Sequence, residues 1–151
     1  MREILFRGKR VDNGEWHKGY YLYSEKEGKH YIVDERITTT LDGILVPNES
    51  GFIKKEVIPQ TIGQYTGLKD KNGNKIFEGD ICKGNEYSDE NEIFVIKYGK
   101  YKTEEWKETY SCNTYQFGWC AEFIKTKEQV HLVTPNGIRI IGNIYEGDPN
   151  D

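Results

Sequence analysis

Three Asn-Gly pairs punctuate the chain, at Asn13-Gly14, Asn72-Gly73 and Asn136-Gly137. Asn-Gly is the strongest short signal for a β-hairpin, because both residues readily take the positive φ of a two-residue turn. Each pair has strand-like sequence on both sides, and Asp42-Gly43 is a fourth candidate turn. Residues 130–133 and 138–145 flank the third pair, and residues 76–82 are expected to form one strand after the second. A chain with turns at these places is expected to fold into antiparallel β structure.

The apolar residues are of the kind that sheets prefer. Val and Ile together number 23, whereas Leu, Ala and Met together number eight, and Ala121 is the only alanine. β-Branched side chains pack well on a pleated surface, while alanine and leucine are the best helix formers. We therefore predict an all-β fold with at most one or two short helices.

Residues 115–129 are compatible with two structures. Tyr115, Phe117 and Trp119 alternate with Gln116, Gly118 and Cys120, which is the period of a strand. Phe117, Cys120, Ala121 and Ile124 also fit one face of a helix. Gly118 and the aromatic residues disfavour a helix, so strand is the preferred interpretation.

Pro59 and Gly63 mark an expected boundary, since proline cannot donate a hydrogen bond within a central strand. The sequence thus predicts an N-terminal antiparallel β unit over residues 1–63 and a second β unit over residues 64–151. The turn and kink residues of the second unit are typical of a small SH3-like barrel.

Several function classes receive no support from the residues. The apolar runs are too short for a membrane helix, and charged residues crowd the N-terminus where a secretory signal would be apolar. The three cysteines and three histidines lack the spacing of a disulfide framework or a zinc site. We expect a cytoplasmic protein with no catalytic residues, no metal and no cofactor.

A nucleic-acid surface is the alternative that the residues favour most. Basic and aromatic residues intermix near the N-terminus, as they do in proteins that bind single strands. The net charge of −4 argues mildly against nucleic acid as the main partner, since phosphate neutralisation supplies most of such affinity. The candidate contacts are Arg2, Phe6, Arg7, Lys9, Arg10, Trp16 and Lys18.

Residues 62–81, which read IGQYTGLKDKNGNKIFEGDI, are the most specific stretch of the chain. They resemble the signature of the YopX family, small proteins of phages and prophages. Residues 2–9 resemble the opening strand of that family, and residues 140–146, in a predicted strand over 138–146, resemble its closing strand. The chain has Gly147-Asp148 where relatives often continue with Asn-Pro and a short helix.

The family motif makes sense as a set of fold determinants. Asn72-Gly73 supplies positive φ for a turn, and Gly79 permits close backbone approach where Glu78-Gly79-Asp80 is expected to kink the strand. Asp80 can accept backbone hydrogen bonds, and Gly142-Asn143 is expected to bulge the last strand. The motif residues are Gln64, Tyr65, Thr66, Gly67, Leu68, Asp70, Gly73, Glu78, Gly79, Asp80, Gly142 and Asn143. The resemblance transfers no activity, because the family is functionally uncharacterised.

These observations lead to a ranked set of hypotheses. The first is a non-enzymatic phage accessory protein that binds a host or phage protein, with self-association as a further option because Tyr and Trp are abundant. The second is a nucleic-acid-binding module that uses the N-terminal residues. The third and weakest is a hydrolase whose site assembles only in the folded chain.

Overall fold

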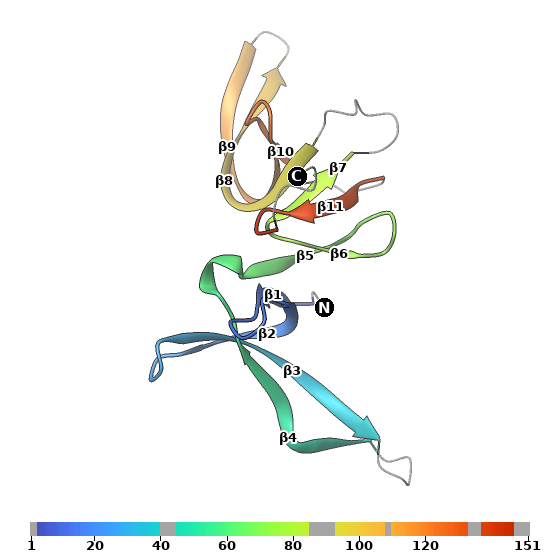
Figure 1. Ribbon diagram of the computed structural model, residues 1–151. Coiled ribbons are helices and arrows are strands. Elements are labelled where there is room, and N and C mark those ends of the chain that lie inside the picture. Colours follow the sequence, from blue (N-terminus) through green and yellow to red (C-terminus); the bar gives the residue numbers. More distant parts are fainter. Residues whose placement is uncertain (1–2, 40–44, 85–92, 108–109, 133–136, 147–151) are drawn as a thin grey trace. The chain divides into compact units, whose positions relative to one another are not determined.

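The computed structural model describes residues 3–39, 45–84, 93–107, 110–132 and 137–146, with the backbone alone for 35–39, 45–52, 103–107 and 110–114. All of its sheets are antiparallel, and the described part has one short 3-10 turn, η1 (Pro59–Thr61). The all-β prediction is therefore confirmed. No helix in the described ranges is long and apolar enough to cross a membrane. The strands are β1 (Phe6–Lys9), β2 (Trp16–Ser24), β3 (Lys29–Thr39), β4 (Leu45–Glu56), β5 (Gly63–Lys69), β6 (Lys75–Phe77), β7 (Asp80–Lys83), β8 (Ile93–Lys107), β9 (Tyr110–Phe123), β10 (Gln129–His131) and β11 (Arg139–Asn143) (Figure 1).

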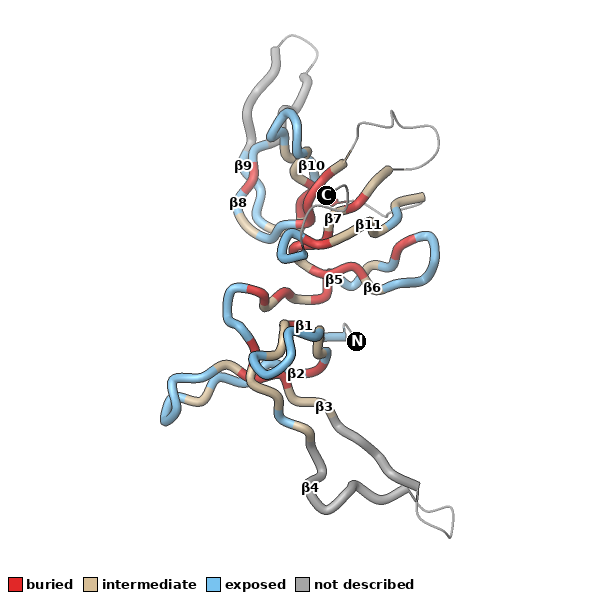
Figure 2. The backbone as a smooth tube through the Cα atoms, viewed as in Figure 1, coloured by how far each residue is buried: buried red, intermediate tan, exposed pale blue. Residues whose placement is uncertain are grey.

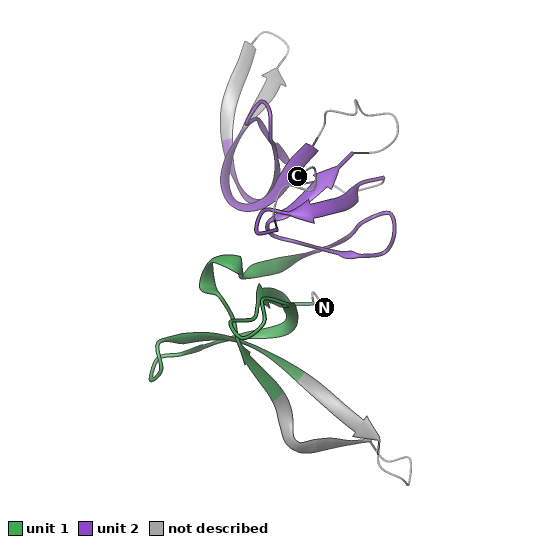
Figure 3. Cartoon of the chain, in the orientation of Figure 1, with its two compact units in different colours: residues 1–65 green, residues 66–151 purple. Residues whose placement is uncertain are grey.

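The chain divides into two compact units, residues 1–65 and residues 66–151 (Figure 3). In the first unit the strands pair in the order β4-β3-β2-β1-β5. The second unit contains the β5–β6 hairpin and a five-stranded sheet of order β10-β9-β8-β7-β11. Strand β5 gives its first three residues to one unit and the rest to the other. The SH3-like character of the second unit stays a prediction.

In the first unit, close backbone packing explains two features of the sequence. Gly19 lies where a Cβ atom would come within 2.2 Å of the Val33 carbonyl oxygen, so only glycine fits between β2 and β3. The η1 turn is tied to β1 by Thr61, whose Oγ1 accepts a hydrogen bond from the Lys9 N–H at 2.8 Å and donates one to the Ile58 carbonyl at 2.7 Å. Among the described side chains of this unit, Ile32 and Val57 are the most buried apolar ones.

The core of the second unit lies on its five-stranded sheet, where Figure 2 shows the buried residues of β7, β8 and β9 together. The only alanine of the chain, Ala121, lies in this core opposite Ile96 on β8. The buried members are Ile76, Cys82, Phe94, Ile96, Ala121 and Leu132. Cross-strand pairs of Ile, Phe and Ala are the kind of contact that stabilises sheets.

The Asn-Gly predictions have mixed outcomes. Asn13-Gly14 joins β1 to β2 and Asn72-Gly73 joins β5 to β6, so two hairpins are confirmed. The third is wrong: the strands on either side of Asn136-Gly137, β10 and β11, lie at opposite ends of the five-stranded sheet. Asp42-Gly43 lies outside the described residues.

Of two further strand predictions, one is wrong and one is confirmed. Residues 76–82 are not one strand, because the chain turns at Glu78-Gly79 and β7 then pairs with β8 and β11 instead of β5. The strand interpretation of residues 115–123 is confirmed by their continuous pairing with β8. No helix forms in residues 124–129, where the chain turns into β10.

Candidate functional site

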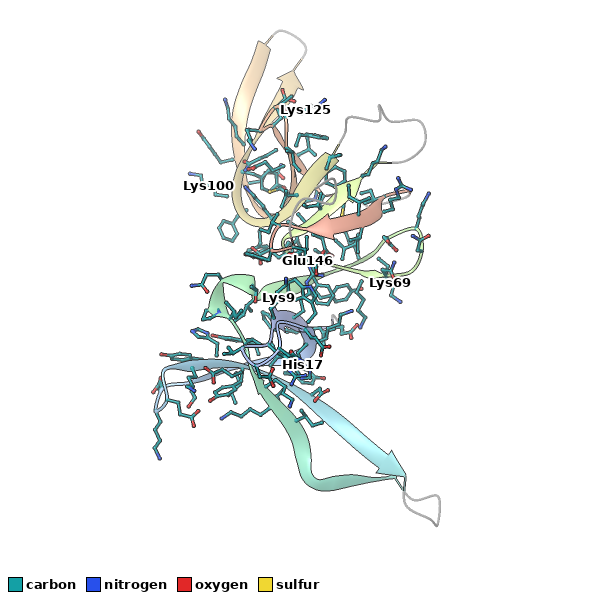
Figure 4. All side chains as sticks on the ribbon, viewed as in Figure 1. Lys9, His17, Lys69, Lys100, Lys125 and Glu146 are labelled. Carbon is teal, nitrogen blue, oxygen red and sulfur yellow. The ribbon has the colours of Figure 1, made fainter. Side chains whose placement is uncertain are left out.

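The β8–β9 hairpin carries a row of exposed aromatic side chains. Side chains that face each other across an antiparallel pair lie on the same side of the sheet, and so do residues two apart along one strand. The register pairs Tyr98 with Trp119, Lys100 with Phe117, and Lys102 with Tyr115. These six residues therefore share one side of the hairpin, and we call it the aromatic face; Figure 4 marks Lys100 on it.

The aromatic face continues the core outwards. Ile96 and Ala121, the next pair along the same side, are buried, and Trp119 still packs against the core cluster. Beyond Trp119 the rings are open to solvent: Tyr98 is 50% exposed, Tyr115 64% and Phe117 72%. The hairpin thus extends past the point where the unit can cover it.

The rings of the aromatic face hold one another in place. The Tyr98 ring meets Phe117 edge-to-face at a centroid distance of 5.3 Å, and Trp119 at 4.8 Å. Each such pair contributes about 0.5–1.5 kcal/mol beyond the burial of area. The Lys100 ammonium lies 4.3 Å from the centroid of the Tyr115 ring, which is a cation–π contact between β8 and β9.

The opposite side of the hairpin is held by polar contacts. The Tyr101 hydroxyl is hydrogen-bonded to Gln116 Oε1 at 3.0 Å and to Nδ1 of His131 on β10. Burial raises the pKa of Tyr101. On the same side Lys97 donates to Glu122 Oε1 at 2.6 Å, and this hydrogen bond lowers the pKa of Glu122.

Charge therefore differs between the two sides of the hairpin. Lys97 is neutralised by Glu122, whereas Lys100 and Lys102 have no carboxylate partner among the described side chains. Among the described side chains, the aromatic face thus carries two lysines without a carboxylate partner, in a chain whose net charge is −4. Chemically, the face can bury apolar groups and attract anionic ones at the same time.

The N-terminal residues predicted to bind nucleic acid are only partly brought together. The register pairs Arg7 with Lys18 and Lys9 with Trp16, which places these four on one side of the sheet, a group we call the basic face. The Arg7 guanidinium lies 4.6 Å from the centroid of the Trp16 ring, and the Lys9 ammonium 5.5 Å from it. Lys18 is exposed, whereas Arg7 is buried.

The other three predicted residues do not join the basic face. Phe6 points to the opposite side of the sheet, where its ring lies 5.6 Å from Tyr21. Arg10 is engaged by Asp12 through two hydrogen bonds of 2.8 and 2.5 Å, which raise the pKa of Arg10 and lower that of Asp12. Arg2 lies outside the described residues.

The family-motif residues hold turns and strand ends. Buried Asp70 accepts hydrogen bonds from the N–H groups of Asn72, Asn74 and Ile140, at 2.9, 2.8 and 3.3 Å. Burial raises the pKa of Asp70, but these hydrogen bonds outweigh it and hold the pKa below 3.8. Thr66 donates to the Ile76 carbonyl at 2.9 Å, which ties β5 to β6.

The second half of the motif contacts the closing strand. Asp80, 1% exposed, accepts from the Phe77 N–H at 2.8 Å and from Asn143 Nδ2 at 3.3 Å. Gly79 has φ +83°, donates to the Ile96 carbonyl at 2.9 Å and accepts from the Ile144 N–H at 3.0 Å. The register of β11 shifts between Ile140 and Gly142, next to the predicted bulge.

The remaining motif residues lie along the same segment. Gln64 pairs with Phe6, the Tyr65 ring is buried, Gly67 has φ +90°, Leu68 packs against the core and Glu78 is half-buried. Gly73, at φ +84°, donates to the Asp70 carbonyl at 3.0 Å. Among the described residues, no three His, Cys, Asp or Glu side chains lie together as a metal site would require.

Sequence reasoning missed the aromatic face as a site. Its signal was present in the alternation of Tyr115, Phe117 and Trp119, which indicated a strand. Their common exposure, and the lysines beside them, depend on the register with β8 and on how far the hairpin extends beyond the core.

Fold and surfaces together define an all-β protein of two small units with an exposed aromatic face on a long hairpin. The family model "YopX protein" matches residues 5–150, and the chain therefore belongs to the YopX family. Among solved structures, the chain is similar to protein EF1440 from Enterococcus faecalis, with 19% identity, a TM-score of 0.44, and coverage of 95% of this chain and 94% of that one. No curated protein matches.

Proposed function

We propose that this YopX family member is a non-enzymatic phage or prophage accessory protein, which binds another protein in the cytoplasm of its bacterial host through the aromatic face. The observation that carries the proposal is the exposure of Tyr98, Tyr115 and Phe117 side by side on one hairpin. Contiguous exposed apolar groups of this kind mark interaction surfaces.

The composition of the face favours a protein partner. Tyr, Trp and Phe are enriched at the centres of protein interfaces, where they supply large contact areas. Because Tyr98 already contacts Phe117 and Trp119, these rings lose little freedom when a partner covers them. The edge-to-face geometry also leaves less flat ring surface for stacking nucleobases than parallel rings would.

A nucleic-acid-binding module is the second candidate function. The observation in its favour is that Arg7, Lys9, Trp16 and Lys18 share one side of the first unit. It ranks second because Trp16 already contacts two of these cations and the chain is acidic as a whole. The hydrolase hypothesis remains untested.

The test is capture from bacterial lysate at moderate salt with the immobilised full chain. The double variant Tyr98→Ala/Phe117→Ala removes the centre of the aromatic face, and Tyr20→Ala/Tyr23→Ala is a matched control that removes two exposed tyrosines of the first unit. A protein retained by the wild type and the control but lost by the first variant supports the proposal. Equal retention by all three, or recovery of nuclease-sensitive material alone, contradicts it.

A further inference from the structure

We infer that the partner contributes an extended acidic segment, which adds as a strand to the outer edge of β9 beside the aromatic face. This inference rests on the proposed function and specifies the chemistry of the partner. It follows from three observations: the direction of the β9 backbone groups, the absence of edge protection, and the position of the Lys100 ammonium.

The backbone of β9 offers hydrogen-bonding groups along its outer edge. On that edge Phe123 donates to Glu128, and the Trp119 carbonyl accepts from Leu132 at 3.2 Å. In antiparallel sheets the N–H and C=O of one residue point to the same side, and every second residue points the same way. The N–H and C=O groups of Phe117 and Tyr115 therefore point to the outer edge too, where no strand in the described ranges pairs with them.

This edge lacks the devices that usually protect edge strands. Natural sheets place lysine, proline or bulges on open edges to prevent pairing with other chains. Residues 110–121 contain no charged residue and no proline. Their pairing with β8 runs without a register shift. A regular, uncharged edge is suited to accept an added strand, the mode in which backbone hydrogen bonds give affinity and side-chain contacts give specificity.

The charge at the edge selects an acidic segment. Lys100 belongs to β8, but its ammonium lies over the Tyr115 ring on β9. Strands are spaced about 4.8 Å apart, so a carboxylate on an added strand comes within reach of that ammonium. Lys102, opposite Tyr115, adds a second positive charge on the same side, and the first acidic residue along that side of β8 is Glu104, which pairs with Asn113 beyond it. On the side continuous with the aromatic face, an added strand that carries both acidic and apolar side chains complements the lysines and the rings.

A selection from a displayed library of short random peptides tests the inference without assuming a sequence. We expect the wild-type chain to enrich peptides with net negative charge, and the Lys100→Glu/Lys102→Glu variant to bind them at least about tenfold more weakly. An enriched pool that is neutral or basic overturns the inference, and so does enrichment that is unchanged by the charge reversal. Tighter binding of oligothymidylate than of any peptide overturns it as well.

Backbone pairing is tested on an enriched peptide, so that the fold of the protein is not disturbed. Two versions of the peptide are compared, one N-methylated at the odd-numbered residues and one at the even-numbered residues. One version is expected to lose binding and the other to bind within about twofold of the unmodified peptide, because only one edge of the added strand faces β9. Equal effects of the two methylation patterns overturn strand addition. A comparison of Phe117→Pro with Phe117→Ala gives a second readout, since both lose the ring and only proline also loses the outward N–H.

Failure of this inference is distinguishable from failure of the proposed function. If lysate capture still depends on Tyr98 and Phe117 while no acidic peptide is enriched, the aromatic face binds a protein by another mode. If capture does not depend on these rings, the proposed function fails with it.

Discussion

The side chain of Asn143 donates a hydrogen bond from Nδ2 to Oδ1 of Asp80, at 3.3 Å and across 63 positions of sequence. Both side chains are buried, at 3% and 1% exposure. This contact joins the signature segment to the closing strand, so two segments of the family pattern that are far apart in sequence meet in the interior of the second unit.

Asp80→Ala is expected to lower the free energy of unfolding by about 2–4 kcal/mol, because the Phe77 N–H and the Asn143 amide lose an acceptor while buried. Asn143→Ala is expected to cost less, and a double-mutant cycle should show coupling of about 1 kcal/mol. Urea unfolding measures these values. Asp12→Ala, an exposed control, is expected to leave the free energy of unfolding almost unchanged, and additive effects of the buried pair would contradict the prediction.

Gly79→Ala is expected to destabilise the chain more than Gly73→Ala. Both glycines have φ near +84°, where a side chain costs about 1–2 kcal/mol. A Cβ at Gly73 meets nothing within 4 Å, whereas at Gly79 it meets Tyr145, Asn143 and Ile144 at 3.3–3.4 Å. Thermal unfolding of the two variants separates backbone strain from crowding, and equal losses would show that crowding contributes nothing.

Asp70→Asn is expected to remove a pH-dependent part of the stability. Because the folded pKa of Asp70 lies below the ordinary 3.8, its carboxylate stabilises the fold fully above that value, and this contribution is lost as the pH falls through the lower folded pKa. The wild type should therefore exceed the variant in unfolding free energy at pH 7, and the difference should shrink below pH about 4. A difference independent of pH would mean that the charge of Asp70 plays no part.

Lys9→Ala/Lys18→Ala is expected to weaken any binding of oligothymidylate and to reduce its salt dependence, since both cations lie on the basic face. Arg10→Ala serves as the control, because Asp12 already engages that guanidinium. Fluorescence anisotropy over a salt series measures both quantities. Identical salt slopes for the wild type and the double variant would remove the nucleic-acid candidate.

Much of the fold could be predicted from local chemistry. The Asn13-Gly14 and Asn72-Gly73 hairpins depend on turn geometry and adjacent strands, which the sequence displays directly. The hairpin predicted at Asn136-Gly137 is wrong because a turn signal does not say which strands the flanking segments will join. The single strand predicted over residues 76–82 is wrong for a related reason, since Gly79 at positive φ redirects the chain to a different sheet partner.

The candidate sites were harder to predict than the fold. The N-terminal patch was drawn from neighbours in sequence, but the two-residue period of β1 sends Phe6 and Arg7 to opposite sides. The aromatic face depends on cross-strand partners such as Tyr98 and Trp119, 21 positions apart, which only the register reveals.

Strand β5 is the last strand of one unit and the first strand of the next. A crossover between related genes that exchanged whole units would have to join two different parents in the middle of a hydrogen-bonded strand. We therefore expect breakpoints between related genes to avoid β5.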